Sequence, residues 1–326
     1  MKIFLTGGSG YIGSVTTELL CNDGHDVTVF DNLERGHIEA VDPRARLIVG
    51  DLRDASAVFN AMRAVKPDAV VHFAAYALVG ESMQLPSLYF DNNTGGGIHL
   101  LDAMLKYDVP KIIFSSTCAT YGQPEKMPMD ESIPQRPTNP YGESKLMFET
   151  ALRWEQQRHG LKPVFLRYFN ACGATPSHGE DHDPETHIIP NILRVPLGQA
   201  DAVPVFGDDY PTPDGTCLRD FIDIVDLAKA HVCAVRRMID GKMDEPYEIF
   251  NIGTGRPLSV MELITAFEKV NGIKLNYRFA PRREGDVIAV WADPSLAEKK
   301  LGWKATRTVE ETLASAWAWE KKLAAK

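Results

Sequence analysis

A glycine-rich stretch directly after the first apolar run constrains the fold of this chain more than any other feature. Lys2–Thr6 has Ile, Phe and Leu at its centre and is predicted to be a buried strand. Gly7, Gly10 and Gly13 follow at intervals of three residues. A pyrophosphate bound between a strand and a helix needs a tight turn, bare backbone N–H groups and close helix packing, and glycine permits all three. The helix predicted at Tyr11–Asn22 would present its positive end to the phosphates.

An acidic residue in the right place favours a dinucleotide over an ordinary glycine turn. The next predicted strand, Asp26–Phe30, is followed by Asp31, eighteen residues after Gly13. A carboxylate at this place accepts hydrogen bonds from the adenosine ribose hydroxyls and would repel the ribose phosphate of NADP. The sequence therefore predicts NAD as the cofactor. The alternative is a glycine turn followed by a solvated aspartate.

Strand and helix signals alternate through the rest of the first half. Four further apolar runs are predicted to be strands, at Arg46–Val49, Ala69–Phe73, Lys111–Ser115 and Lys162–Arg167. Helices are predicted between them, at Ala55–Val65, Pro86–Tyr107 and Tyr141–His159. This alternation predicts an α/β fold with a doubly wound parallel sheet of the Rossmann type, whose ligand crevice lies outside the carboxyl ends of the strands.

The pattern changes after Arg167, where a smaller, interleaved α+β substrate region is predicted. Polar loops are predicted at 170–190 and 208–216, and helices at Ile222–Gly241, Ser259–Asn271 and Val309–Leu323. Strands are predicted at Glu248–Ile252, which could return to the parallel sheet, and near Lys274–Phe279. We assign residues 1–168, with a returning segment near 220–256, to an NAD-binding domain, and 169–219 plus 257–326 to a substrate domain.

Small or polar residues directly follow two strands, at the edge where a ligand would lie. Asp51 and Leu52 follow the third strand, where they would bond and cover an adenine ring. The alternative is that this segment is only the N-cap region of the next helix, which Asp54 would start. Phe73, Ala74 and Ala75 follow the fourth strand, and the two alanines would let a cofactor lie against the backbone.

The helix predicted at Pro86–Tyr107 contains two unusual features. Asn92 is a polar residue in its interior and is either a ligand contact or part of the surface. Gly95, Gly96 and Gly97 would each cost about 1 kcal/mol relative to Ala. Close packing could offset this cost, but the sequence does not say against what.

Two motifs after the middle strands carry the candidate catalytic groups. Thr117 ends a run of three hydroxyl residues after the fifth strand. Asn139 suits a helix N-cap, so Tyr141 and Lys145 lie four residues apart on one helix face. Such a Tyr/Lys pair also occurs on ordinary surfaces. After a dinucleotide motif and a hydroxyl cluster it indicates catalysis.

The chemistry of this pair follows from its pKa values. A phenol with a pKa of about 10 is ionised in about one molecule per thousand at pH 7, which handicaps it as a base by roughly 4 kcal/mol. A neighbouring ammonium and a positive nicotinamide ring both favour the phenolate. We expect Tyr141 to remove a proton from a substrate hydroxyl that Thr117 also binds. Lys145 would lower the tyrosine pKa and hold the nicotinamide ribose.

The composition narrows the classes of partner. The 326 residues carry a formal net charge of −9, which disfavours nucleic acid and anionic membranes. The five cysteines form no Cys-x-x-Cys, so no disulfide framework or zinc site is indicated and a cytoplasmic location is expected. We expect no signal peptide and no membrane span. A His- and Asp-rich part of the loop, with Asp181, His182, Asp183, Glu185 and His187, lacks ligand spacing, so no metal site is predicted.

Longer motifs over nearly the whole chain resemble the extended short-chain dehydrogenase/reductases, and among them most closely the UDP-glucose 4-epimerases. The glycine motif and the Tyr/Lys pair are typical of the whole superfamily. Residues 206–216 and 280–286 are much more specific. Further matching segments are Val79–Ser82, Leu166–Asn170 and Arg219–Ile222.

The resemblance implies an activity and a set of binding residues. A tightly held NAD would oxidise the sugar of UDP-glucose or UDP-galactose at C4 and return the hydride to the opposite face. The cofactor would lie along Gly7, Gly10, Tyr11, Ile12, Gly13, Asp31, Asn32, Asp51, Leu52, Phe73, Ala74, Ala75, Asn92, Lys145 and Phe169. The UDP moiety would lie near Asn170, His187, Val205, Phe206, Arg219, Arg283 and Asp286. Arginines suit a pyrophosphate, although each could instead form a surface ion pair. The family's homodimers imply that helices 86–107 and 141–159 pair across a two-fold axis.

The chain departs from this family pattern at five positions. Thr117 replaces a Ser of many members, which keeps the hydroxyl and adds a methyl group. Ala77, His187 and Asp223 stand where some members carry Lys, Asn and His. Val290 occupies a position where a bulky residue excludes N-acetylated sugars in some members. The resemblance therefore implies that UDP-GlcNAc and UDP-GalNAc are also accepted.

Two other functions are compatible with a dinucleotide fold. A nucleotide-sugar 4,6-dehydratase needs an acid next to Thr117, where this chain has Cys118 and Ala119. A non-catalytic dinucleotide sensor would need neither Tyr141 nor Lys145. The presence of both side chains favours the epimerase.

Overall fold

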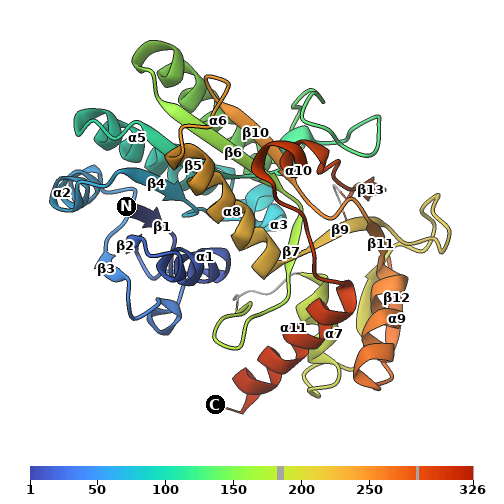
Figure 1. Cartoon of the computed structure of the whole chain (residues 1–326). Coiled ribbons are helices and arrows are strands. Elements are labelled where there is room, and N and C mark those ends of the chain that lie inside the picture. Colours follow the sequence, from blue (N-terminus) through green and yellow to red (C-terminus); the bar gives the residue numbers. More distant parts are fainter. Residues whose placement is uncertain (182–186, 284–285, 326) are drawn as a thin grey trace.

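The computed structural model of the chain contains a seven-stranded parallel sheet with the strand order β10-β6-β5-β4-β1-β2-β3 (Figure 1). It describes residues 1–181, 187–283 and 286–325. The strands are β1 (Lys2–Thr6), β2 (Asp26–Asp31), β3 (Arg46–Val49), β4 (Ala69–His72), β5 (Lys111–Thr117), β6 (Lys162–Tyr168) and β10 (Glu248–Ile252). The predicted α/β fold with a parallel sheet is confirmed, and Glu248–Ile252 returns to the sheet beside β6. The strand order reverses at β1, between β2 and β4, which is where such sheets bind ligands.

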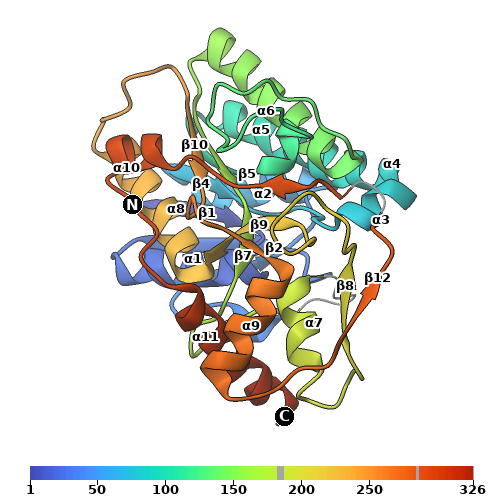
Figure 2. The ribbon, with the colours of Figure 1, turned by 90° about the vertical axis from the view of Figure 1, so that its right-hand side faces the viewer.

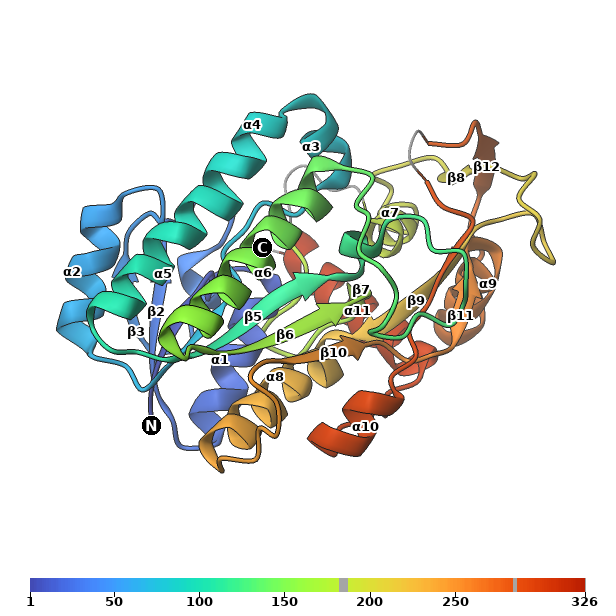
Figure 3. The same ribbon diagram turned by 90° about the horizontal axis from the view of Figure 1, so that it is seen from above.

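Helices cover both faces of this sheet, as the view from above shows (Figure 3). One face carries α1 (Tyr11–Asn22) and α8 (Ile224–Ile239). The other carries α2 (Ala55–Val65), α5 (Gly96–Lys106) and α6 (Pro140–His159). Strands buried on both faces need continuous apolar runs rather than alternating ones, and this is the pattern seen in the sequence.

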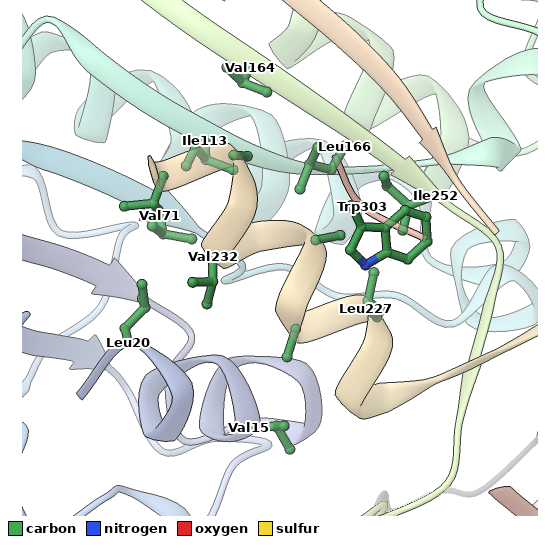
Figure 4. Packing of buried hydrophobic residues seen from close by; sticks show 14 of the residues in the cluster. Val15, Leu20, Val71, Ile113, Val164, Leu166, Leu227, Val232, Ile252 and Trp303 are labelled. Atoms are coloured by element: carbon green, nitrogen blue, oxygen red, sulfur yellow. The ribbon is translucent and has the colours of Figure 1, made fainter. Parts of the chain in front are cut away.

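The core divides into two layers because side chains alternate along each strand. Ile3 and Leu5 face α1 and α8, whereas Phe4 faces the opposite helices. In the first layer, Leu20 of α1 and Val232 of α8 pack beneath the strands (Figure 4). The two helices therefore cover the apolar side chains on this face of the sheet.

The second region lies beyond the carboxyl ends of the strands (Figure 2). Its two small sheets pair β8 (Val203–Phe206) with β12 (Tyr277–Ala280), and β9 (Leu218–Asp223) with β7 (Asn170–Cys172), β11 (Pro257–Ser259) and β13 (Ala289–Val290). Its helices are α7 (Ile188–Arg194), α9 (Val260–Asn271) and α11 (Val309–Ala324), whereas α10 (Ser295–Leu301) packs against α8 and β10 of the parallel-sheet region. The proposed domain boundaries remain an interpretation of this arrangement.

Several predicted elements differ from the structure. The segment predicted as a loop at 170–190 contains β7 and the start of α7, and α8 begins only at Ile224 because the Asp223 side chain caps it. The helix predicted at Pro86–Tyr107 is divided into α4 (Pro86–Tyr89), the π-helical η2 (Phe90–Gly95) and α5. The sequence also missed α3 (Val79–Gln84) and the short 3₁₀ helices η1 (Ile38–Ala40) and η3 (Cys118–Tyr121).

The structure explains the glycines of α5. A Cβ added to Gly96 would lie 2.9 Å from the Cβ of Leu52, and one added to Gly97 would lie 2.8 Å from the ring of Phe148. Glycine therefore lets α5 approach the loop after β3 and the neighbouring helix α6 more closely than any other residue would. This close approach offsets the low helix propensity of glycine.

Candidate active site

A cavity of about 830 Å³ lies at the carboxyl ends of the parallel strands and extends to the second region. Its size is within the range of small-molecule sites. The loops after β1, β2, β3 and β4 line one part, and β8, β9 and α7 line the other. Every residue predicted to bind cofactor or substrate lines this cavity except Val205.

The exception has a simple cause. Val205 is fully buried in the core beneath α7 and α9, whereas Pro204 and Phe206 line the cavity. Side chains alternate along β8, so two neighbours cannot face the same side. The prediction for the Val205 side chain is corrected: Pro204, which the sequence analysis missed, is the cavity residue next to Phe206.

The glycine turn after β1 fits a dinucleotide pyrophosphate. Gly7 has a φ of +77°, and a Cβ there would lie 2.5 Å from the backbone nitrogen of Ala74. A Cβ on Gly13 would lie 2.0 Å from the carbonyl oxygen of Gly7. Gly10 differs, because its added Cβ would meet only the Gly7 oxygen, at 3.5 Å, and would extend into the cavity. Packing therefore explains Gly7 and Gly13, whereas Gly10 leaves room for a ligand beside the backbone.

Replacing Gly10 and Gly13 with Ala should separate these two roles. Gly10→Ala should reduce the NAD content of the purified protein severalfold with little change in melting temperature, since the backbone at Gly10 (φ −84°, ψ 174°) suits any residue. Gly13→Ala should destabilise the fold by about 3 kcal/mol, because backbone must move. Nucleotide released on denaturation and thermal unfolding measure the two effects. Equal NAD content in Gly10→Ala and the unmodified protein would contradict the first.

The predicted adenosine end of the cavity is rich in carboxylates. Asp31 accepts hydrogen bonds from the backbone nitrogens of Ser9, at 3.0 Å, and Leu33, at 2.9 Å. Asp51 pairs with Arg53 at 2.6 Å, and this pair lowers the pKa of Asp51 to about 2. The adjacent helix α2 is capped by Asp54, as the alternative interpretation of this segment expected. Asp51 also lines the cavity and stays a candidate for adenine.

The sequence analysis missed a set of polar residues at the same end. Glu34 and Arg35, which follow β2, line the cavity together with Tyr76 and Glu81. The Tyr76 hydroxyl donates to Glu34 at 2.6 Å, and Arg35 pairs with Glu81 of α3 at 2.7 Å. These contacts join the loop after β2 to α3 across the cavity edge. No local signal identifies them, because the partners lie more than forty residues apart in sequence.

Tyr141, Lys145 and Thr117 meet in the middle of the cavity. The Asn139 side chain accepts a hydrogen bond from Gly142 and begins α6 as predicted, so Tyr141 and Lys145 lie on its first two turns. The Lys145 ammonium donates to the carbonyl oxygen of Ser115 at 2.9 Å and lies 4.9 Å from the centre of the Phe114 ring. Tyr168, which the sequence analysis missed, hydrogen-bonds Ser115 at 2.8 Å between hydroxyl oxygens and also lines the cavity.

Burial dominates the electrostatics of this group. It raises the pKa of Tyr141 well above its usual value. The hydrogen bond with Thr117 lowers this pKa, but by less than burial raises it. Burial also lowers the pKa of Lys145 to about 7. In the protein without cofactor the net shift is therefore upward, so Tyr141 is ionised in fewer molecules than a free phenol. The predicted lowering of this pKa by Lys145 stays a prediction. A positive group bound beside it would favour the phenolate.

The other end of the cavity is basic and aromatic. Arg219 lies 3.4 Å and Arg283 3.7 Å from different oxygens of Asp286, and the Arg283 guanidinium stacks on Phe206 at 4.3 Å. Both arginines form an ion pair with Asp286, as the alternative expected. All three residues line the cavity, however, so the pair is not confined to the outer surface. Asn170 donates to the carbonyl oxygen of Asp220 at 3.0 Å, which orients it at the boundary between the regions.

The remaining predicted positions are also placed. His187 lies 2.8 Å from Glu180, and both line the cavity. Ala77 and Val290 line it as well, whereas Asp223 caps α8 and hydrogen-bonds Thr312 at 2.9 Å, away from the cavity. His182, Asp183 and Glu185 lie outside the described residues. Within those residues, no group of His, Cys, Asp and Glu is arranged to hold a metal, and no helix has the length and apolarity of a membrane span.

Comparison with known proteins agrees with this geometry. The sequence pattern of the NAD dependent epimerase/dehydratase family matches residues 3–253. The chain belongs to that family. It is 47% identical over 324 residues to the UDP-glucose 4-epimerase of Lacticaseibacillus casei, a match covering 98% of this chain and 97% of the relative.

Two solved structures of family members share the fold. The UDP-glucose 4-epimerase of Bifidobacterium longum in complex with NAD+ and UDP has a TM-score of 0.93 at 39% identity, covering 99% of this chain and 98% of that one. The UDP-Glc/GlcNAc 4-epimerase of Campylobacter jejuni has a TM-score of 0.86 at 37% identity, covering 98% and 99%. The predicted resemblance to the UDP-glucose 4-epimerases is confirmed by these matches.

Proposed function

We propose that the chain is an NAD-dependent UDP-glucose 4-epimerase that interconverts UDP-glucose and UDP-galactose. One observation carries this proposal: a buried Tyr141–Lys145 pair lies between a glycine turn suited to a dinucleotide and an arginine cluster suited to a second pyrophosphate, all within one cavity. A dehydrogenase of small alcohols would not need the arginines. The membership of the family and the similarity to UDP-glucose 4-epimerases support the same activity.

The protein's own groups define the chemistry at the sugar. NAD, when bound, would accept a hydride from C4 and return it, so that no net oxidation results. Tyr141 would take the proton of the 4-hydroxyl and later give it back. Thr117 would donate or accept a hydrogen bond at the same hydroxyl, and Lys145 would hold the nicotinamide ribose close to it. The low exposure of Tyr141, 7%, keeps water from competing for the proton.

Epimerisation also requires the sugar to present both faces to the cofactor. Arg219, Arg283 and Phe206 would hold the UDP moiety at the far end of the cavity, where the charges of both arginines suit a pyrophosphate. The sugar itself would remain loosely held and turn within the cavity while the nucleotide stays fixed. The binding residues named here follow from the cavity geometry and the family resemblance.

A single assay distinguishes this function from its alternatives. Purified protein is incubated with UDP-galactose, without added NAD, and the products are separated by chromatography. UDP-glucose is the expected product. A 4-keto-6-deoxy sugar would indicate a dehydratase instead, and bound NAD without turnover would indicate a sensor.

We infer in addition that Val290 permits N-acetylated sugars. Val290 lies on β13, is 8% exposed, lines the cavity and pairs with Arg219 in the strand register. A valine is small enough to leave room for an acetamido group. The similar fold of a UDP-Glc/GlcNAc 4-epimerase supports this inference.

A homodimer in a reducing, cytoplasmic setting is the expected state of the protein. Met147 and Trp154, seven residues apart on one face of α6, are 43% and 66% exposed. Helix α5 lies beside α6 on the same side of the sheet (Figure 3). Large exposed apolar side chains on such a face are typical of subunit contacts. All five cysteines have free thiols, which is compatible with a reducing compartment.

Charge introduced on this face should separate the subunits. Trp154→Glu is expected to convert the dimer to a monomer, since it places a carboxylate in an apolar contact. Light scattering coupled to size-exclusion chromatography measures the mass directly. Ile38→Glu is the matched control, because Ile38 is an exposed apolar residue on η1 and not on α6. This substitution should leave the mass unchanged. A dimer that survives Trp154→Glu would argue against this face.

A further inference from the structure

A buried carboxylate lies one helical turn beyond Lys145 and has no part in the proposed mechanism. Glu149 is fully buried on α6 and does not line the cavity. Tyr141, Lys145 and Glu149 recur every four residues, so they share one face of the helix. A buried charge is costly unless it is paired and hydrogen-bonded. The partners of Glu149 therefore show how its charge is stabilised.

The Glu149 carboxylate connects α6 to two strands of the sheet. Arg167 of β6 donates from Nε to one oxygen at 2.9 Å and from a terminal nitrogen to the other at 2.6 Å. The hydroxyl of Ser116 donates to the first oxygen at 2.6 Å, and the side-chain amide of Gln135 to the second at 3.0 Å. Ser116 lies on β5 between Ser115, which accepts from Lys145, and Thr117. By binding Ser116, Glu149 therefore holds the part of β5 that carries Ser115 and Thr117.

The charge of Glu149 is firmly held. Burial favours the protonated form, but the hydrogen bonds from Arg167, Ser116 and Gln135 outweigh it, so the pKa of Glu149 lies below its usual range. Arg167 is itself 1% exposed and also donates to the Tyr121 hydroxyl at 2.9 Å. The pair is thus a fixed, buried arrangement rather than a mobile surface contact.

We propose that Glu149 is a positioning residue that acts on the reaction through Lys145: it ties α6 to β5 and places a buried negative charge one helical turn from the Lys145 ammonium. This proposal rests on the epimerase function and adds a residue to it. Glu149 lies outside the cavity, so any effect must pass through its neighbours on α6, β5 and β6.

The groups that face Lys145 leave Glu149 as the source of negative charge. β5 contributes the Ser115 carbonyl oxygen and the Phe114 ring. β4 contributes His72, which burial keeps neutral with a pKa of about 3. Tyr141 on α6 and Tyr168 on β6 are phenols whose pKa values are raised by burial. Glu149 alone raises the pKa of Lys145, opposing the burial that lowers it to about 7.

The sign of the pH effect follows directly. The Lys145 ammonium is present below its pKa and is lost as the pH rises through it. Removing the Glu149 charge lowers this pKa further, so Glu149→Gln should move the falling limb of kcat to lower pH by about half a unit to one unit. The KM for UDP-glucose should stay within about twofold, because the groups proposed to bind UDP lie at the other end of the cavity.

Two further variants separate charge from structure. Glu149→Asp keeps the carboxylate and should restore most of the limb position. Glu149→Gln with Arg167→Gln removes the unpaired buried arginine, improves the chance of a folded protein and should still show the shift. NMR titration of the lysine ε-carbons, assigned with Lys145→Met, gives the Lys145 pKa independently of turnover and should fall in the same variants.

The outcomes are distinct. A lower Lys145 pKa and a shifted kcat limb in both Gln variants support the proposal. A shift in the single variant only would assign the effect to the unpaired Arg167. An unmoved limb with a reduced kcat would show that Glu149 has only a structural role. Either result would overturn the proposal. If the unmodified protein does not epimerise UDP-galactose at all, the function fails, and the NMR titration still tests the effect of Glu149 on Lys145.

Discussion

Tyr141→Phe is expected to lower kcat about 10³-fold while leaving the NAD content unchanged. The substitution removes only the hydroxyl oxygen that would take the proton of the sugar 4-hydroxyl. The ring remains and keeps its edge contact with Tyr89, whose centre lies 6.4 Å away. A loss of this size is the usual contribution of a positioned acid or base, and the residual rate would come from binding and orientation alone.

The measurement needs three readouts on the same preparation. Conversion of UDP-galactose gives kcat, nucleotide released on denaturation gives the NAD content, and thermal unfolding tests the fold. Tyr107→Phe, at a tyrosine that does not line the cavity, is the matched control and should retain full activity. Retention of more than about a tenth of the turnover in Tyr141→Phe would exclude the phenol as the base.

Val290→Tyr should lower turnover of UDP-GalNAc by about 100-fold or more. Turnover of UDP-galactose should change by less than about fivefold. Val290 packs beside Tyr121, Met129 and Phe169 with its outer surface on the cavity. The bulk of a tyrosine ring cannot enter that packed cluster, so it must extend into the cavity and occupy the space of the acetamido group. The smaller hydroxyl of UDP-galactose would still fit.

Ile288→Tyr is a close control for this substitution. Ile288 lies two residues earlier in the same segment, is 44% exposed and does not line the cavity. The ratio of kcat/KM for UDP-GalNAc to that for UDP-galactose should therefore fall only in Val290→Tyr. If the unmodified protein has no activity on UDP-GalNAc, the inference about Val290 is wrong, and the UDP-galactose activity is unaffected by that result.

Local patterns located the elements around the dinucleotide motif. The bounds of β1, β3 and β10 match the predicted runs and β2 extends one residue beyond its run, because each strand is a short run of mainly apolar residues. The start of α6 was equally readable, since Asn139 and Pro140 act within a single turn. The division of the helix at 86–107 was not, because a π-helical turn depends on what packs against it.

The sequence by itself determined the cofactor class and the family, since both depend on motifs that can be read along the chain, and it proposed most of the residues that line the cavity. Only the tertiary structure decided which side of β8 faces the ligand, which distant partners Glu34 and Arg35 meet, and how strongly burial shifts the Tyr141 and Lys145 pKa values. Orientation, long-range contact and desolvation are properties of the assembled chain. They depend on the residues that surround a side chain in space, and those residues come from distant parts of the sequence.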